Sequence, residues 1–203
     1  MSFDVALARM AQLQALFTPA AAAPAPTPSP APTTTSFATQ LQSASAATLT
    51  GTQPPAGTAG QAIVNLVSKE IGVAEQPPGS NDSPRIAQFR QATAGSGVGP
   101  WCAYFTSWAA REAGVPLGDN GQGFGRVDDV YAWAQKAGKA IPNGEGVTPQ
   151  PGDLIVWDEH IGVVESVGAD GTISTIEGNS SDSVARRSYG ADGGGAVGYV
   201  RLG

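Results

Sequence analysis

The 203-residue sequence is very poor in the side chains that build metal sites and disulfides. It contains a single cysteine, Cys102, and a single histidine, His160. One cysteine excludes an intramolecular disulfide framework and any zinc site made of cysteines. One histidine excludes the common multi-histidine metal clusters. We expect neither a metal nor another cofactor.

Basic charge and long apolar runs are also scarce. The sequence has 11 Lys and Arg against 17 Asp and Glu, with a formal net charge of −6. This balance argues against nucleic-acid binding, which needs a basic face, and gives no electrostatic attraction to an anionic membrane or cell wall. No apolar run approaches the roughly 20 residues of a membrane span. The N-terminus does not resemble a secretory signal, because Asp4 replaces a basic residue and Arg9 interrupts the apolar stretch.

The N-terminal part divides into a short helical pattern and a low-complexity tract. Residues 1–17 predict an amphipathic helix, which is marginal alone, so a frayed tail and a docking helix for a partner both stay open. Residues 18–60 are rich in Pro, Ala and Thr and predict a mostly disordered linker. The folded domain is expected over residues 61–203. In the helix expected over residues 1–17, the apolar positions alternate in steps of three and four: Phe3, Ala6, Met10, Leu13 and Phe17.

The pattern of the folded part changes from helical to extended near Pro142. Before it, helices are expected over four segments: 61–75, from 84 onward, after Cys102, and 127–137. After it come five expected strands: 154–157, 160–167, 172–179, "SVARRSY" and "AVGYVRLG". Helices followed by consecutive strands with short turns predict an α+β domain, with its helical part packed on an antiparallel sheet of about five strands.

The only cysteine lies in "GPWCAYFTSWAAREAG". A Gly- and Pro-rich lead-in ends at Trp101, and helical spacing then continues as far as Gly114, which suits the end of a helix. Cys102 is therefore expected at a helix N-terminus, where free N–H groups and the helix dipole favour an anion such as a thiolate. The alternative is a small buried apolar residue, which is the commoner fate of a lone cysteine.

The only histidine lies on the first strand of an expected hairpin with the turn "GADG". Two registers are open, one of which places Gly162 opposite Glu177 and His160 opposite Asn179. In both registers the side chains of His160, Glu177 and Asn179 project from one face, and Gly162 and Gly178 leave room beside them. An acceptor beside an imidazole fixes its tautomer, so the sequence favours a thiol nucleophile with an oriented histidine over a solvated strand end.

Four segments together resemble the CHAP domain (cysteine, histidine-dependent amidohydrolase/peptidase), a branch of the papain-like superfamily. They are "GPWCAYFTSWAAREAG", "PQPGDLIVWDEHIGVVESV", "STIEGNSSDSVARRSY" and "GYVRL". The resemblance covers about residues 61–203 and implies a papain-like fold. By motif position it implies that Cys102 is the nucleophile, that His160 is the general base, that Glu177 orients the histidine and that Asn179 assists.

The resemblance further implies a bacterial peptidoglycan hydrolase that cuts an amide bond. The bond is either that between N-acetylmuramic acid and L-alanine or one within the stem and cross-bridge peptides. Two alternatives stay open: a catalytically silent module of the same fold that binds the cell wall or a partner, and a thiol amidase of a non-wall substrate. The protein is expected in the cytoplasm before export and then in the cell envelope or secreted, by a route without a recognisable signal peptide. The N-terminal part, with "SFATQLQSA", resembles leaders of flagellar rod-associated wall hydrolases, which implies a partner in the flagellar or secretion apparatus.

Other residues near the expected site carry further expectations. Some phage-derived relatives have an aspartate-rich calcium loop where this sequence has "AGSGVGP", so no calcium site is expected. The pair Asp158-Glu159 would raise the pKa of the imidazole if close to it, and otherwise lies solvated on a turn. Trp101, Tyr104 and Trp157 are candidates for lining a groove for sugar or peptide, with core packing as the alternative.

Overall fold

The fold is described from a computed structural model, and the description covers residues 56–203. The expected helix over residues 1–17 lies outside the described residues, and so does most of the expected linker over residues 18–60. The expected docking of that helix to a partner is therefore not described either. Within the described part, no helix is long and apolar enough to cross a membrane.

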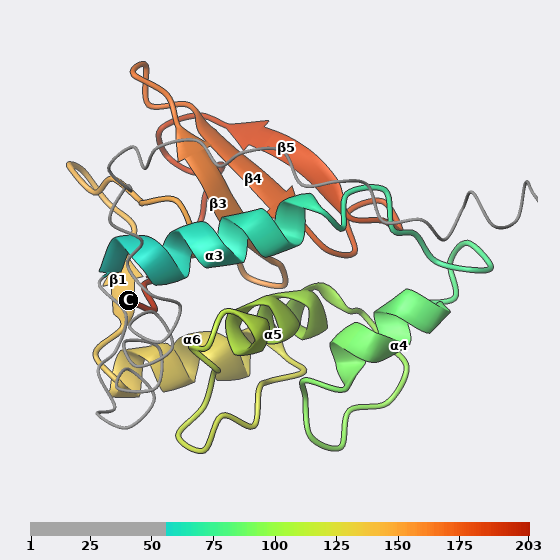
Figure 1. The fold of residues 1–203 in the computed structure, drawn as a ribbon. Helices are drawn as coiled ribbons and strands as arrows, with labels where there is room; N and C mark the ends of the chain where they lie inside the picture. Colours follow the sequence, from blue (N-terminus) through green and yellow to red (C-terminus); the bar gives the residue numbers. More distant parts are fainter. Residues whose placement is uncertain (1–55) are drawn as a thin grey trace, which may run out of the picture. The chain divides into compact units, whose positions relative to one another are not determined.

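Helices come first and strands second along the described part of the chain, as the sequence predicts (Figure 1). The helices are α3 (Ala56–Ser68), α4 (Pro84–Arg90), α5 (Cys102–Glu112) and α6 (Val127–Lys136). The strands are β1 (Ala140–Pro142), β2 (Leu154–Val156), β3 (Ile161–Val167), β4 (Ile173–Glu177), β5 (Ala185–Tyr189) and β6 (Gly198–Val200). They form one antiparallel six-stranded sheet in the order β1-β6-β2-β3-β4-β5, which confirms the α+β class. The short strand β1 was not predicted.

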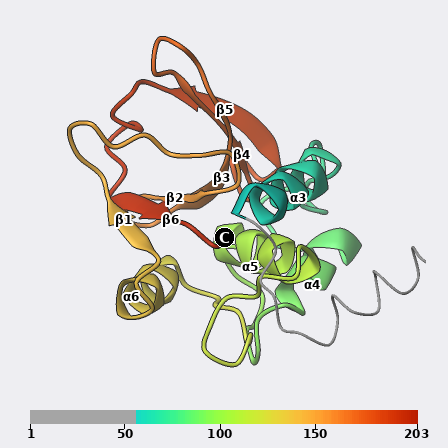
Figure 2. The ribbon, with the colours of Figure 1, turned by 60° about the vertical axis from the view of Figure 1, so that its left-hand side comes forward.

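The helices lie along one side of the sheet (Figures 1 and 2). Neighbouring strand residues point to opposite faces, and their packing follows this alternation. Leu154 and Val163 pack with residues of α3 and α5 in the larger core. Ile155, Val164 and Tyr199 belong to a smaller cluster on the other face. The sheet therefore buries apolar side chains on both faces.

The ends of the helices follow from local chemistry. The hydroxyl of Ser83 accepts a hydrogen bond from the N–H of Ile86 at 3.2 Å, and Pro84 occupies the first turn, so α4 begins as predicted. Helix α3 differs from its expected range: it begins at Ala56, before residue 61, and ends before residue 75. Gly72, with φ +91°, turns the chain beyond the helix, and Ile71 just before it is exposed.

The hairpin of β3 and β4 has the predicted register only at the end nearest the expected site. There Val163 pairs with Ile176, as in the register that sets Gly162 opposite Glu177. The register shifts by one between Val164 and Ser166, so neither predicted register holds along the whole hairpin. The irregularity centres on Glu165, whose carboxylate is bound by Arg186 of β5 at 2.7–3.0 Å.

Candidate active site

Cys102 is the first residue of α5 and is 4% exposed. The helix has no side chain that caps its N-terminus, and its last turn ends at Ala113 before Gly114 with φ +79°. The predicted position of the cysteine at a helix start is confirmed. Free backbone N–H groups at this end favour a negative charge beside the sulfur atom.

Trp101 is fully buried and does not line a groove, so its expected part in substrate binding is wrong. Its indole N–H donates to the carboxylate of Glu75 at 2.9 Å, and its ring packs against Phe89 and Phe105. Glu75 is itself 4% exposed and also accepts a hydrogen bond from the N–H of Asn81 at 2.8 Å. Sequence reasoning missed Glu75, because its Pro- and Gly-rich loop gives no sign of a buried partner. The residue before the cysteine is thus held by a buried carboxylate.

His160 and Glu177 lie in contact, as the strand alternation predicts. His160 Nε2 is 2.9 Å from Glu177 Oε2. The other oxygen of Glu177, Oε1, accepts hydrogen bonds from the hydroxyl of Thr175 at 2.5 Å and from that of Tyr189 at 2.9 Å. The carboxylate is nearly inaccessible to solvent, whereas the histidine side chain is 29% exposed. The two hydroxyl donors were missed, although Thr175 is two residues before Glu177 on the same face of β4.

The sole cysteine and the sole histidine also meet. Burial lowers the pKa of His160, but hydrogen bonds to Cys102 and Glu177 and the negative charge of both outweigh it and raise the pKa from 6.5 to about 9. Because Nε2 is bonded to Glu177, Nδ1 is the ring nitrogen left for the sulfur. The imidazole is therefore charged at neutral pH and lies between two acceptors, a sulfur and a carboxylate.

Glu177 responds to its neighbours in the opposite direction. Burial raises the pKa of Glu177, but hydrogen bonds from His160, Thr175 and Tyr189 outweigh it and hold the pKa below its ordinary value. Burial and the nearby carboxylate raise the pKa of Tyr189 to about 12, so its hydroxyl stays a donor. The carboxylate therefore remains negative beside the imidazolium.

Glycines make room around this pair of side chains. A Cβ at Gly162 would lie 2.6 Å from Cγ of Glu177. A Cβ at Gly178 would lie 2.6 Å from Cβ of Phe105 and 2.9 Å from the Trp101 ring. The first glycine admits the carboxylate, and the second lets the end of β4 approach α5.

The remaining expected residues have different surroundings. Asn179 follows β4 in a left-handed turn with φ +57°, and its side chain makes no hydrogen bond to His160 in the described structure. Trp157 is partly buried: its ring lies 5.6 Å from that of His160, and its N–H donates to the carbonyl of Gly193 at 2.9 Å. Tyr104 is 6% exposed and donates to the carbonyl of Gly97 at 3.0 Å. Glu177, rather than Asn179, is thus the partner of the histidine.

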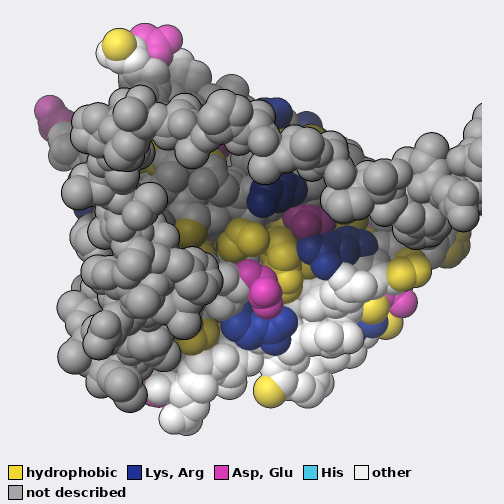
Figure 3. Space-filling view, in the orientation of Figure 1, with side chains coloured by type: hydrophobic (Ala, Val, Ile, Leu, Met, Phe, Trp, Pro, Cys, Tyr) yellow, Lys and Arg dark blue, Asp and Glu magenta, His cyan; other side chains and the backbone are white. Residues whose placement is uncertain are grey.

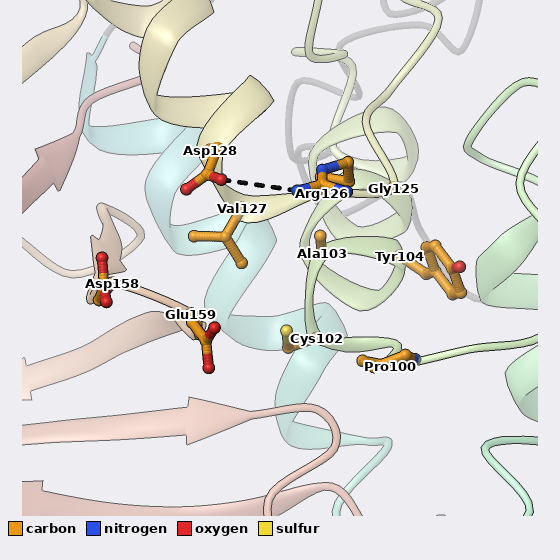
Figure 4. Close-up of a pocket in the computed structure, with 10 residues that line it drawn as sticks. All are labelled: Pro100, Cys102, Ala103, Tyr104, Gly125, Arg126, Val127, Asp128, Asp158 and Glu159. Atoms are coloured by element: carbon orange, nitrogen blue, oxygen red, sulfur yellow. Dashed lines mark ion pairs between the residues drawn. The ribbon is translucent and has the colours of Figure 1, made fainter.

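A cavity of about 440 Å³ opens beside the sulfur atom (Figure 4). Asp158 and Glu159 form the exposed tip of the tight turn from β2 to β3, and they line one wall. They are not among the groups that shift the pKa of His160. Across from them, the start of α6 contributes Arg126 and Asp128, which form an ion pair at 3.8 Å. Tyr104 also lines this cavity. Figure 3 shows one face of the molecule, on which hydrophobic, basic and acidic side chains are mixed. His160 is not visible on that face.

Comparison with known families agrees with this geometry. Residues 93–179 match the family model of the CHAP domain. The matched segment runs from before Cys102 to Asn179 and contains His160 and Glu177. CHAP domains are amidases and peptidases that commonly act on peptidoglycan. No curated protein matches the chain.

Proposed function

We propose, taking the CHAP-domain match as the premise, that this protein is a cysteine-dependent peptidoglycan hydrolase that cuts an amide bond. The observation that carries the proposal is the contact of one imidazole with both the only cysteine and a buried carboxylate. This is the arrangement of a thiol nucleophile with an oriented proton donor and acceptor. A catalytically silent module would have no need for the charged imidazole beside the sulfur.

The reaction follows from the positions of the groups. The thiolate of Cys102 attacks the amide carbonyl carbon in the cavity, and the carbonyl oxygen becomes an oxyanion. The N–H of Cys102, at the uncapped start of α5, donates to that oxyanion. His160 then gives its proton to the leaving nitrogen, which departs as a neutral amine and leaves a thioester on the sulfur.

Water completes the cycle. His160, now neutral, takes a proton from a water molecule that attacks the thioester carbon, and the acid product leaves. The sulfur atom returns to a thiolate and the imidazole to its charged form. Glu177 stays ionised throughout and stabilises the imidazolium that begins and ends the cycle.

The scissile bond lies either between N-acetylmuramic acid and L-alanine or within the stem and cross-bridge peptides. We further propose that the protein acts at the cell envelope and that Asn179 assists at the edge of the site. Purified peptidoglycan suspensions should lose turbidity with the wild-type protein and keep it with Cys102→Ala. Mass spectrometry then identifies the bond: a new free amine on L-alanine indicates an amidase, and an internal cut indicates an endopeptidase.

Substrates outside the cell wall provide the counter-test. If folded proteins are cut and peptidoglycan is not, the protein is a thiol amidase of another substrate class. If Cys102→Ala clears peptidoglycan as fast as the wild type, the cysteine mechanism is wrong. Cys102→Ser is the matched variant, because it keeps the side-chain volume close to the original while replacing the thiolate with a far weaker nucleophile.

A further inference from the structure

The carboxylate of Glu177 is held unequally at its two oxygens. Oε2 is bonded to His160 at 2.9 Å, whereas Oε1 accepts from Thr175 at 2.5 Å and from Tyr189 at 2.9 Å. Both hydroxyls belong to the sheet: Thr175 lies on β4 itself and Tyr189 on the neighbouring strand β5. The imidazole is therefore left with one carboxylate oxygen, while the other is occupied by two donors.

These two bonds restrict how the carboxylate can turn. Turning the carboxylate out of its present plane would break both hydroxyl bonds in a region where Thr175 has no exposed surface and Glu177 is 1% exposed. Buried donors and acceptors without partners are costly, so the rotated carboxylate is disfavoured. The ring of Tyr189 is itself packed against Trp157, with ring centroids 5.0 Å apart. The hydroxyl bonds are thus anchored by the sheet and by an aromatic contact.

We propose that Thr175 and Tyr189 are positioning residues, which fix the Glu177 carboxylate so that Oε2 points at His160. This inference rests on the proposed function, because it assigns the two residues to the same thiol site. Both hydroxyls donate to Glu177 on the oxygen that does not bond to His160, so both residues act through the carboxylate rather than on the substrate. Their hydrogen bonds also stabilise the negative form of the carboxylate.

Single hydroxyl deletions test this assignment. Tyr189→Phe and Thr175→Val each remove one donor and keep most of the side-chain shape, while Thr175→Ser keeps the donor. Tyr131→Phe is the matched control, because Tyr131 is not bonded to Glu177. For each variant, kcat and KM are measured on peptidoglycan over a range of pH, and thermal unfolding checks the fold.

Tyr189→Phe and Thr175→Val should each lower kcat about tenfold and leave KM unchanged, because one lost charge-assisted hydrogen bond corresponds to about one pKa unit. Losing a donor raises the pKa of Glu177, so the acid limb of the pH profile should move to higher pH by about one unit. A merely structural effect would lower activity equally at every pH. Thr175→Ser should recover most of the activity lost in Thr175→Val.

A second readout keeps this inference separable from the proposed function. Cys102 is the only thiol in the chain, so its rate of alkylation by iodoacetamide reports the thiolate without any substrate. The alkylation rate falls on the acid side of its pH profile, and this fall should occur at higher pH in Tyr189→Phe and Thr175→Val, even if no peptidoglycan is cut. The assignment is overturned if both variants match Tyr131→Phe in rate and pH dependence, or if Thr175→Ser behaves like Thr175→Val.

Discussion

The charge of His160 can be tested directly, because it is the only histidine in the chain and gives a single imidazole signal in an NMR titration. Its pKa is raised from 6.5 to about 9. At about 1.4 kcal/mol per pKa unit, this shift corresponds to about 3 kcal/mol in favour of the charged form. Because burial acts in the opposite direction, Cys102 and Glu177 together supply more than this net amount.

The test removes the two partners of His160, Cys102 and Glu177, first separately and then together. Glu177→Gln deletes one negative charge at nearly constant volume and should lower the pKa of His160 by about one unit or more. Cys102→Ala should lower it as well. In the double variant burial dominates, so the pKa should fall below 6.5. Glu159→Gln is the matched control, because it removes a charge from the residue next to His160 that does not shift its pKa.

The same titration sets the alkaline limit of activity. As pH rises through about 9, the imidazole loses the proton that the leaving nitrogen needs, so kcat should fall there in the wild type. In Glu177→Gln this limb should move to lower pH. A wild-type titration near 6.5, or an equal shift in Glu177→Gln and Glu159→Gln, would refute the reasoning.

Two further substitutions test the packing that supports the site. Gly162→Ala places a Cβ 2.6 Å from Cγ of Glu177 and should lower kcat at least tenfold in a folded protein. Gly144→Ala is the control: a Cβ there has no atom within 4 Å, so kcat should stay unchanged. Trp101→Phe removes the donor to a buried carboxylate and should lower the free energy of unfolding by about 1–3 kcal/mol in denaturant titrations. Trp133→Phe removes a similar bond at an exposed position and should cost much less; equal losses in the two tryptophan variants would contradict the argument.

Much of the site could be predicted because it depends on local rules. The start of α5 at Cys102 follows from the Gly- and Pro-rich lead-in that ends at Trp101 and from the helical spacing after it. The shared face of His160 and Glu177 follows from strand alternation, which is the same in every odd register. These inferences need only neighbours in sequence or one hairpin, and so they survived the local shift of register at Glu165.

The parts that sequence reasoning missed depend on contacts between distant segments. Glu75 meets Trp101 across 26 positions of the chain, and no periodicity relates a loop to the residue before a helix. Tyr189 reaches Glu177 from β5, where strand pairing had not been predicted. Trp101 was a candidate for lining a groove, with core packing as the alternative, and the structure favours the alternative because its indole bonds to a buried acceptor that composition does not reveal.

The order of the sheet also has a consequence for when this fold can close during synthesis. Strand β6 is the last of the strands described over residues 56–203, yet it lies between β1 and β2, and β2 in turn pairs with β3 beside the histidine. During synthesis on the ribosome, the sulfur and imidazole emerge well before the segment that joins these strands. The sheet cannot close until that segment has been translated, so the candidate site gains its full support only after β6 has left the ribosome.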